Sequence, residues 1–180
     1  MPSTAPCVVA ELGAADAGEA LTIQYAAYLA EARRYGTTEI PPLRETVEEL
    51  AADLQRPDVR GFGAWAGSRL VGSVRLRGDR VGTGSGCAEL ARYSVAPDAQ
   101  GHGIGRALLE RAHAELAAGD VTWLVTGARS DENLRIYRRA GYEETGRLVD
   151  SAGVELLRLE RLAPRPRTRP CHGSSGVPST

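Results

Sequence analysis

Apolar residues recur along the chain with two periods, and these periods separate expected helices from expected strands. Helical spacing runs from residue 14 to about residue 35, from Thr46 to just before Pro57, from Gly103 to Ala118, and from Ser130 or Asp131 to Arg139. Strand-like runs occupy residues 7–10, 62–66, 69–77, 87–95, 121–126, 142–149 and 154–162. This order predicts an α/β domain with a mixed sheet and one right-handed parallel crossover, between the strands at 87–95 and 121–126.

Glycine-containing turns connect several of these runs. Gly67-Ser68 predicts a two-residue hairpin, and residues 151–153 predict the turn of a final hairpin. Residues 78–86 contain four glycines and no periodicity, so we expect a mobile connection there. A nucleotide-binding reading of its G-x-G-x-G is weak, because no helix follows.

Length and composition are those of one ordinary domain. Of 180 residues, 42% are apolar and 25% charged, and the net charge is -1. This balance predicts no general attraction to nucleic acid or to a membrane surface. We expect the domain to span residues 1–163 and residues 164–180, rich in Pro, Arg, Ser and Gly, to be a disordered tail. The tail's three arginines favour a solvated end over a partner-binding arm.

The sequence contains no targeting signal and no cysteine motif that we can identify. The sequence has no apolar run of transmembrane length and no signal-peptide pattern, so we expect a cytoplasmic location. Three scattered cysteines predict neither disulfides nor zinc. Cys87 is expected to be a buried strand residue, although an acyl-cysteine route stays open. No metal site is predicted, because His102 and His113 lack partners at ligand spacing.

A glycine-dotted loop, residues 100–105, joins the strand at 87–95 to a helix. Helix starts leave backbone N–H groups unpaired, and glycines let an anion approach them, so the loop predicts a phosphate site. Arg106 can add a charge-assisted contact. A P-loop is excluded because all 22 cationic residues are arginine, and a dinucleotide fingerprint fails because Arg106 stands at its third glycine.

Two motifs resemble the GCN5-related N-acetyltransferase (GNAT) family. The first is Q-x-x-G-x-G at Gln100, Gly103 and Gly105, and the second is the segment from Asn133 to Tyr142. With the element order, the resemblance covers about residues 6–162. It implies the GNAT fold, a central, mixed and mostly antiparallel sheet flanked by helices, with acetyl-CoA as co-substrate.

The resemblance also implies the cofactor-binding residues. Backbone N–H groups of Gly101, His102, Gly103, Ile104, Gly105 and Arg106 would bind the pyrophosphate; the alternative is a glycine turn with only a packing role. The pantetheine arm would pair with the backbone of Ser94 and Val95, in a slot opened where the strands at 87–95 and 121–125 splay apart. Asn133 would hydrogen-bond the cofactor.

Two residues are candidates for acid–base chemistry. An alkyl amine with a pKa near 10.4 is neutral in only about one molecule in a few thousand at pH 7, so a base is useful. Glu89 lies where many relatives carry that base; its alternative is a salt bridge to an arginine, for example Arg92 or Arg75. Tyr137 lies where the family carries its general acid, and its alternative is simple aromatic packing. His102 is left out of this pair, since it would face solvent or phosphate, and His113 is expected at the surface or in packing.

These residues predict an acetyl-CoA-dependent N-acetyltransferase that uses direct transfer in a ternary complex. The acceptor would be a small-molecule or peptide primary amine. We expect its recognition by Tyr25, Tyr28, Arg33 and Tyr35 and by the loops at 37–44 and 78–86. The alternatives are a non-catalytic acyl-CoA-binding sensor or assembly module, and an enzyme of the same fold using a longer acyl-CoA or a hydroxyl acceptor. A homodimer is compatible with the resemblance, although nothing in the sequence places an interface.

Overall fold

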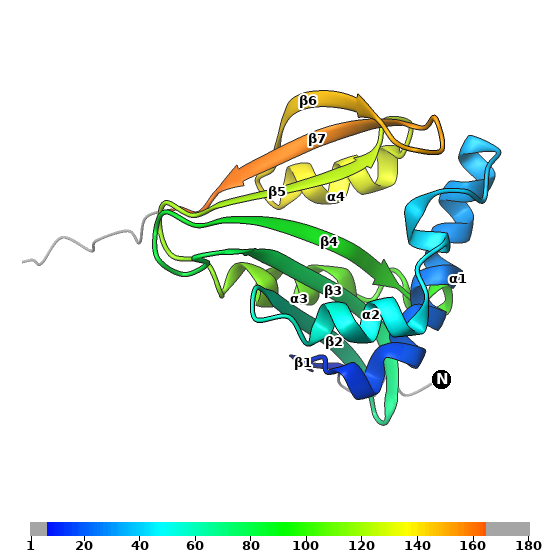
Figure 1. The fold of residues 1–180 in the computed structure, drawn as a ribbon, viewed down its shortest axis with the longest axis horizontal. Coiled ribbons are helices and arrows are strands. Elements are labelled where there is room, and N and C mark those ends of the chain that lie inside the picture. The colour runs from blue at the N-terminus through cyan, green and yellow to red at the C-terminus, as the bar shows by residue number, and fades with distance from the viewer. Residues whose placement is uncertain (1–6, 165–180) are drawn as a thin grey trace, which may run out of the picture.

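The computed structural model describes residues 7–164, which form one seven-stranded sheet with helices on both faces (Figure 1). The strands are β1 (Cys7–Glu11), β2 (Val59–Ala66), β3 (Arg69–Asp79), β4 (Cys87–Val95), β5 (Val121–Gly127), β6 (Glu143–Val149) and β7 (Glu155–Leu162). The helices are α1 (Ala17–Tyr35), α2 (Val47–Leu54), α3 (Ile104–His113) and α4 (Asp131–Arg139). Short 3-10 turns lie at Ala14–Asp16, Pro41–Leu43 and Pro97–Ala99.

The sheet order is β1-β2-β3-β4-β5-β7-β6. Each neighbouring pair is antiparallel except β4 and β5, which are parallel and connected through α3. This confirms the predicted mixed, mostly antiparallel sheet with one parallel crossover. The crossover places the start of α3 at the end of β4, where the glycine loop lies.

The two faces of the sheet carry different helices. Leu70 packs with Ile23 of α1 and Leu50 of α2 in one apolar cluster. A larger cluster on the other face holds Leu108 of α3 and Leu134 of α4 against the strands. In Figure 1, α1 and α2 accordingly lie on the opposite side of β3 and β4 from α3. Both faces of the central strands are therefore covered, which fixes the position of β4.

Several element boundaries differ from the sequence-based ones. The helix predicted to reach Ala118 ends at His113. Strand β3 continues to Asp79, into the predicted loop, because Asp79 pairs with Cys87 at the start of β4. Strand β2 begins at Val59, three residues before the predicted Phe62, because Val59 already pairs with Arg77. Pairing to a neighbouring strand thus extends strands beyond their local apolar pattern.

The connection between β3 and β4 is irregular, as predicted, but buried Asp120 anchors it. The Asp120 carboxylate accepts backbone N–H bonds from Gly82 at 2.6 Å, Gly86 at 2.8 Å and Ala117 at 2.9 Å. Burial alone would raise the pKa of Asp120, but these bonds outweigh it and hold the pKa below its usual range. The loop predicted to be mobile is therefore tied to the α3–β5 connection.

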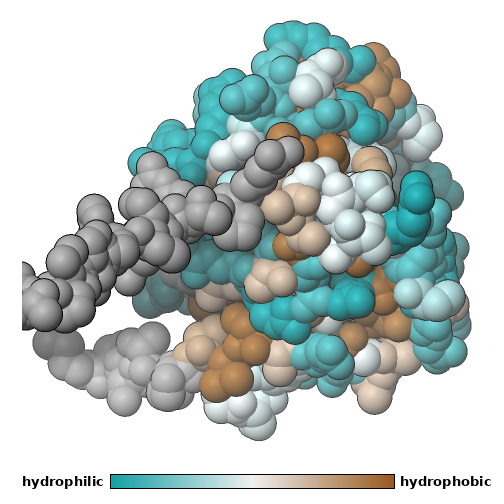
Figure 2. Space-filling view, turned by 90° about the vertical axis from the view of Figure 1, so that its left-hand side faces the viewer, coloured by the Kyte–Doolittle hydropathy of each residue, from teal (hydrophilic) through white to brown (hydrophobic). Residues whose placement is uncertain are grey.

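The surface on this side of the molecule mixes hydrophilic and hydrophobic residues. Figure 2 shows this side, and where the grey atoms leave it visible, hydrophobic residues form separate small areas. Among residues 7–164, no helix is long and apolar enough to cross a membrane. The predicted tail lies almost entirely outside the described residues.

Candidate active site

A slot opens where β4 and β5 stop pairing. The two strands are in register only over Cys87–Glu89 and Val121–Trp123, whereas β5 pairs with β7 along its whole length. Beyond Glu89, the side of β4 that faces β5 therefore lacks a sheet partner. A cavity of about 1240 Å³ lies there, bordered by both strands, α1, α3 and α4. Its unpaired backbone groups are available to a ligand.

Near this slot β4 carries an irregularity. Arg92 has φ +54°, and the register between β3 and β4 shifts between Ser73 and Arg75. An extra residue in one strand bends it and increases its twist. The shift therefore lies in the half of β4 that runs without a β5 partner.

The glycine loop places an open helix start at one end of the cavity. Gly101 and Gly103 both have φ +80°, a left-handed conformation that favours glycine, and a Cβ at either would meet no atom within 4 Å. The first helical bond is donated by Ala107 to Gly103, so the N–H groups of Ile104 to Arg106 have no intrahelical partner. Within the described residues, no side chain caps α3. This geometry fits a pyrophosphate, which the backbone would bind.

Side chains of the loop are engaged within the protein. Gln100 donates its Nε2 to the Val95 carbonyl at 3.2 Å, which ties the loop to the end of β4. The Arg106 guanidinium bonds Glu110 at 2.7 Å, and its exposed side chain runs along α3. His102 is exposed, with its Nδ1 3.3 Å from the Ala99 carbonyl. The loop therefore offers backbone N–H groups in preference to the His102 or Arg106 side chain.

The structure brings nearly all the sequence-predicted cofactor residues to this one cavity. Its walls include Ser94, Val95, Gln100, Gly101, Gly103, Ile104, Gly105, Arg106, Asn133 and Tyr137. His102 is the predicted residue that does not line it. Ser94 and Val95 pair with β3 on one side and border the cavity on the other.

Tyr137 lines the cavity from α4. It is buried, and its ring makes edge contacts with Tyr93 and Tyr142, with ring centroids 5.9 Å apart in each pair. Burial raises the pKa of Tyr137 well above its usual value, so the hydroxyl stays protonated. Tyr137 is therefore packed, as its alternative interpretation held, and its protonated hydroxyl keeps it a candidate proton donor at this cavity.

Glu89 reaches the same cavity from β4. Its Oε2 lies 3.6 Å from Arg77 Nη1, and the side chain is 24% exposed. An arginine thus pairs with Glu89, as its alternative interpretation held, but the two partners given as examples, Arg92 and Arg75, bind Glu45 instead. The strand register explains this result, because Arg77 stands directly opposite Glu89 whereas Arg75 stands opposite Ala91.

A buried ionic network lies beside Glu89, and sequence reasoning missed it. Glu45 accepts hydrogen bonds from Arg75 at 2.6 and 2.8 Å, from Arg92 at 3.1 Å and from Gln24 at 2.8 Å. Burial would raise the pKa of Glu45, but the bonds from Arg75 and Gln24 lower it to about 2. The available signal was the pair of arginines at alternate positions, Arg75 and Arg77, in the middle of a strand whose neighbouring residues are largely apolar.

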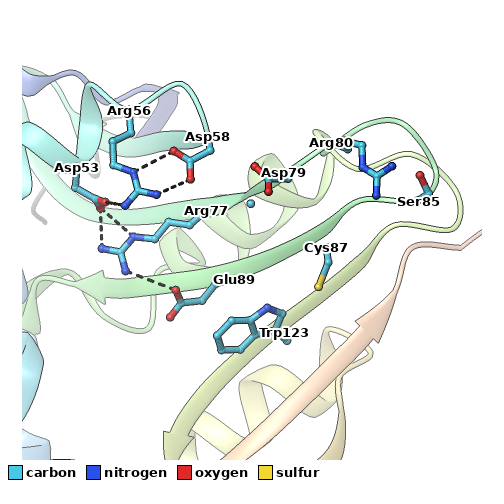
Figure 3. A pocket seen from close by; sticks show the side chains of 11 residues that line it. Asp53, Arg56, Asp58, Arg77, Asp79, Arg80, Ser85, Cys87, Glu89 and Trp123 are labelled. Atoms are coloured by element: carbon cyan, nitrogen blue, oxygen red, sulfur yellow. Dashed lines mark hydrogen bonds and ion pairs between the residues drawn. The ribbon is translucent and has the colours of Figure 1, made fainter.

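Glu89 also borders a second cavity, of about 690 Å³, at the start of β4 (Figure 3). Asp53 and Arg77 line it on one side and Trp123 on the other. Cys87 lines it too and is exposed, so its predicted burial is wrong. Because alternate residues of a strand share a face, Cys87 lies on the same face as Glu89 and opens to this cavity.

The segments predicted to recognise the acceptor divide between the two cavities. Tyr28 and Tyr35 of α1 line the large cavity, and residues 78–80 and 85 line the second one. Tyr25 instead donates its hydroxyl to the Glu45 carbonyl, and exposed Arg33 borders neither cavity. The hairpin turn between β6 and β7 contributes Asp150 and Val154, which sequence reasoning missed.

His113 is half-buried at the end of α3, with its Nε2 2.9 Å from the Tyr142 hydroxyl. Burial, with nearby Arg161, lowers its pKa to about 4, so it is neutral at pH 7. The prediction of a packing role agrees with this contact. Among residues 7–164, no three His, Cys, Asp or Glu side chains gather as a metal site requires.

Comparisons with known proteins agree with this geometry. The acetyltransferase (GNAT) domain family matches residues 31–162. An IAA acetyltransferase of Azospirillum brasilense is 34% identical over 95 residues, which are 52% of this chain and 60% of that protein. The chain therefore spans about three fifths of the length of this curated relative.

Solved structures share the fold at low sequence identity. The ribosomal-protein-S18-alanine N-acetyltransferase of Escherichia coli superposes with a TM-score of 0.71 at 18% identity, covering 89% of this chain and 96% of that one. The PaiA N-acetyltransferase of Thermoplasma acidophilum, solved with coenzyme A, gives a TM-score of 0.70 at 18% identity, with 87% and 99% covered. Since the family match spans well over half of the sequence, the chain belongs to the GNAT family of acetyltransferases.

Proposed function

We propose that this protein is an acetyl-CoA-dependent N-acetyltransferase that moves the acetyl group to a primary amine within a ternary complex. The observation that carries the proposal is the slot between β4 and β5, whose cavity is lined by Glu89 of β4 and by Tyr137 of α4. The open start of α3 lies in the same cavity. Binding, orientation and acid–base chemistry thus meet at one place.

Backbone groups do most of the cofactor binding in this proposal. The N–H groups from Gly101 to Arg106 hold the pyrophosphate, with the glycines giving it access. The β5-facing side of Ser94 and Val95 pairs with the pantetheine amides, and Asn133 adds a side-chain hydrogen bond. The acetyl thioester supplies the reactive carbonyl farther along the slot, toward Glu89 and Tyr137.

The chemistry then needs two proton transfers. The amine nitrogen attacks the carbonyl carbon, so that a C–N bond forms and the C–S bond breaks. Glu89 takes the proton that the nitrogen loses, and Tyr137 gives a proton to the departing thiolate. Because Glu89 also borders the open second cavity, its proton can pass to solvent there without crossing the cofactor site.

The acceptor is expected to enter between α1 and the β6–β7 turn. Tyr28, Tyr35 and Val154 border the large cavity on that side. A small-molecule amine and a peptide N-terminus both remain consistent with these walls, as do acetyl-CoA and a longer acyl donor. A cytoplasmic location and a homodimer stay predictions from the sequence.

The experiment is a thiol-release assay with acetyl-CoA and a panel of primary amines, amino acids and peptides. Amine-dependent release by the wild type, lowered in Glu89→Gln, supports the proposal. Acetyl-CoA binding without release for any acceptor favours the alternative, a non-catalytic acyl-CoA sensor. Equal release by wild type and Glu89→Gln would remove Glu89 as the base.

A further inference from the structure

Arg77 lies between a helix carboxylate and the candidate base, as Figure 3 shows. Its Nε and Nη2 both donate to Asp53 Oδ2 of α2, at 2.9 and 2.7 Å. Its Nη1 lies 3.6 Å from Glu89 Oε2 on β4. One guanidinium therefore joins α2 to the residue that borders both cavities.

The two contacts of Arg77 differ in a way that matters for Glu89. The bonds to Asp53 have the length of strong charge-assisted hydrogen bonds and fix the plane of the guanidinium. The separation from Glu89 is too long for such a bond but close enough for electrostatic attraction. Glu89 is therefore attracted toward Arg77 while no hydrogen bond from Arg77 occupies its oxygens.

The position of Arg77 is set by groups other than Glu89. Asp53 Oδ2 also accepts a hydrogen bond from Arg75 at 2.7 Å, and Arg75 bonds Glu45. The side chains of Arg75, Glu45 and Asp53 are at most 11% exposed. Fully bonded buried networks of this kind are rigid. Arg77 is thus held from the α2 side and presents a fixed positive charge to Glu89.

We propose that Arg77, held by Asp53, is a positioning residue that directs the Glu89 carboxylate toward the acceptor amine. The inference rests on the proposed function, because it assigns Glu89 the role of base. In the proton step, an N–H bond of the amine breaks and an O–H bond forms on Glu89. Arg77 neither gains nor loses a proton.

The test is Arg77→Ala, assayed with the acceptor that gives the highest wild-type turnover. Misdirecting the base should lower kcat on the order of 10- to 100-fold. The KM for acetyl-CoA should stay within about twofold, since Arg77 does not line the cofactor cavity. Added guanidinium ion should restore part of the lost kcat by occupying the gap between Asp53 and Glu89. A structural defect would not respond in this way.

Arg56→Ala is the matched control. Arg56 lines the same second cavity and bonds Asp58 at 2.5 and 3.0 Å. It lies 3.8 Å from Asp53 Oδ1, not from the Oδ2 that holds Arg77, and has no contact with Glu89. Its kcat should be within about twofold of wild type and should not respond to guanidinium. If Arg77→Ala fails to fold, Arg77→Lys tests the inference instead. Lysine keeps the positive charge but lacks the planar guanidinium whose two N–H groups bond Asp53. A lowered kcat in Arg77→Lys supports the inference, and a wild-type kcat overturns it.

A double variant separates this inference from the proposed function. In a Glu89→Gln background, Arg77→Ala should cause little further loss of kcat, because the carboxylate it positions is already gone. Additive losses, an Arg77→Ala kcat near wild type, or an equal loss in Arg56→Ala would each overturn the inference while leaving the acetyltransferase proposal intact. A wild type without thiol release for any acceptor would overturn both.

Discussion

The substitution Glu45→Gln offers the sharpest test of the buried network beside the candidate site. It keeps the size of the side chain and removes the charge to which Arg75, Arg92 and Gln24 donate. The new amide nitrogen is a donor, so it cannot accept the hydrogen bond that Arg75 gives to the oxygen it replaces. One polar contact of a buried guanidinium is therefore left unmade.

The size of the effect follows from the pKa of Glu45, lowered from 4.5 to about 2. Each unit corresponds to about 1.4 kcal/mol, so ionised Glu45 contributes about 3 kcal/mol to stability. Because the folded pKa is the lower one, this contribution is fully present above pH 4.5 and is lost as the pH falls toward 2. At pH 3, about 1 kcal/mol should remain.

The assay is urea unfolding of wild type and Glu45→Gln, followed by tryptophan fluorescence at pH 7 and pH 3. Glu45→Gln should lower the free energy of unfolding by about 3 kcal/mol at pH 7 and by about 1 kcal/mol at pH 3. Glu48→Gln, an exposed change in the first turn of α2, should shift it by about 0.5 kcal/mol or less. A Glu45→Gln effect that is equal at the two pH values would refute the reasoning.

Three further predictions concern the walls of the large cavity. Tyr137→Phe should lower turnover and leave the Kd for acetyl-CoA nearly unchanged in a binding titration; unchanged turnover would remove it as the acid. A Cβ on Gly105 would lie 1.9 Å from the Tyr93 hydroxyl. Gly105→Ala should therefore raise the Kd for acetyl-CoA and lower the free energy of unfolding by about 1–3 kcal/mol. Gly18→Ala is the control, because a Cβ there meets no atom within 4 Å and should not lower the stability of the protein. The pKa of His113 is about 4 in the folded protein and 6.5 in the unfolded chain. As the pH falls below 6.5, the unfolded chain therefore binds a proton at His113 before the folded protein does, and the free energy of unfolding decreases. Between pH 7 and pH 5, the free energy of unfolding measured in urea should therefore fall by about 1–2 kcal/mol less for His113→Gln than for wild type. Equal decreases in the two proteins would contradict the assignment.

Local sequence signals predicted the elements and the cofactor side of the site. Gly101 and Gly103 adopt positive φ at a helix start. Because glycine adopts this conformation most easily, the two glycines in the sequence predict it. Strand periodicity placed Glu89 on β4, and the second motif placed Tyr137 on α4. These signals depend only on residues close together in the sequence, so they can be interpreted without knowledge of the tertiary structure.

Long-range contacts could not be predicted in the same way. The pairing of Arg77 with Glu89 depends on the register of two strands separated by an irregular connection. Glu45 looks like a solvated glutamate before a helix until α1 and β3 cover it. The exposure of Cys87 likewise depends on the cavity beside β4, which local periodicity does not reveal.

The central claim, that the glycine loop and the β4–β5 slot form an acetyl-CoA site, is tested most directly by calorimetric titration with acetyl-CoA. Wild type should bind, and Gly103→Glu should abolish binding by placing bulk and negative charge where the pyrophosphate lies. Gly67→Glu is the matched control, since Gly67 also has a positive φ and open space but lies in the β2–β3 turn, and it should bind like wild type. Retained binding by Gly103→Glu, or no binding by wild type, would contradict the claim.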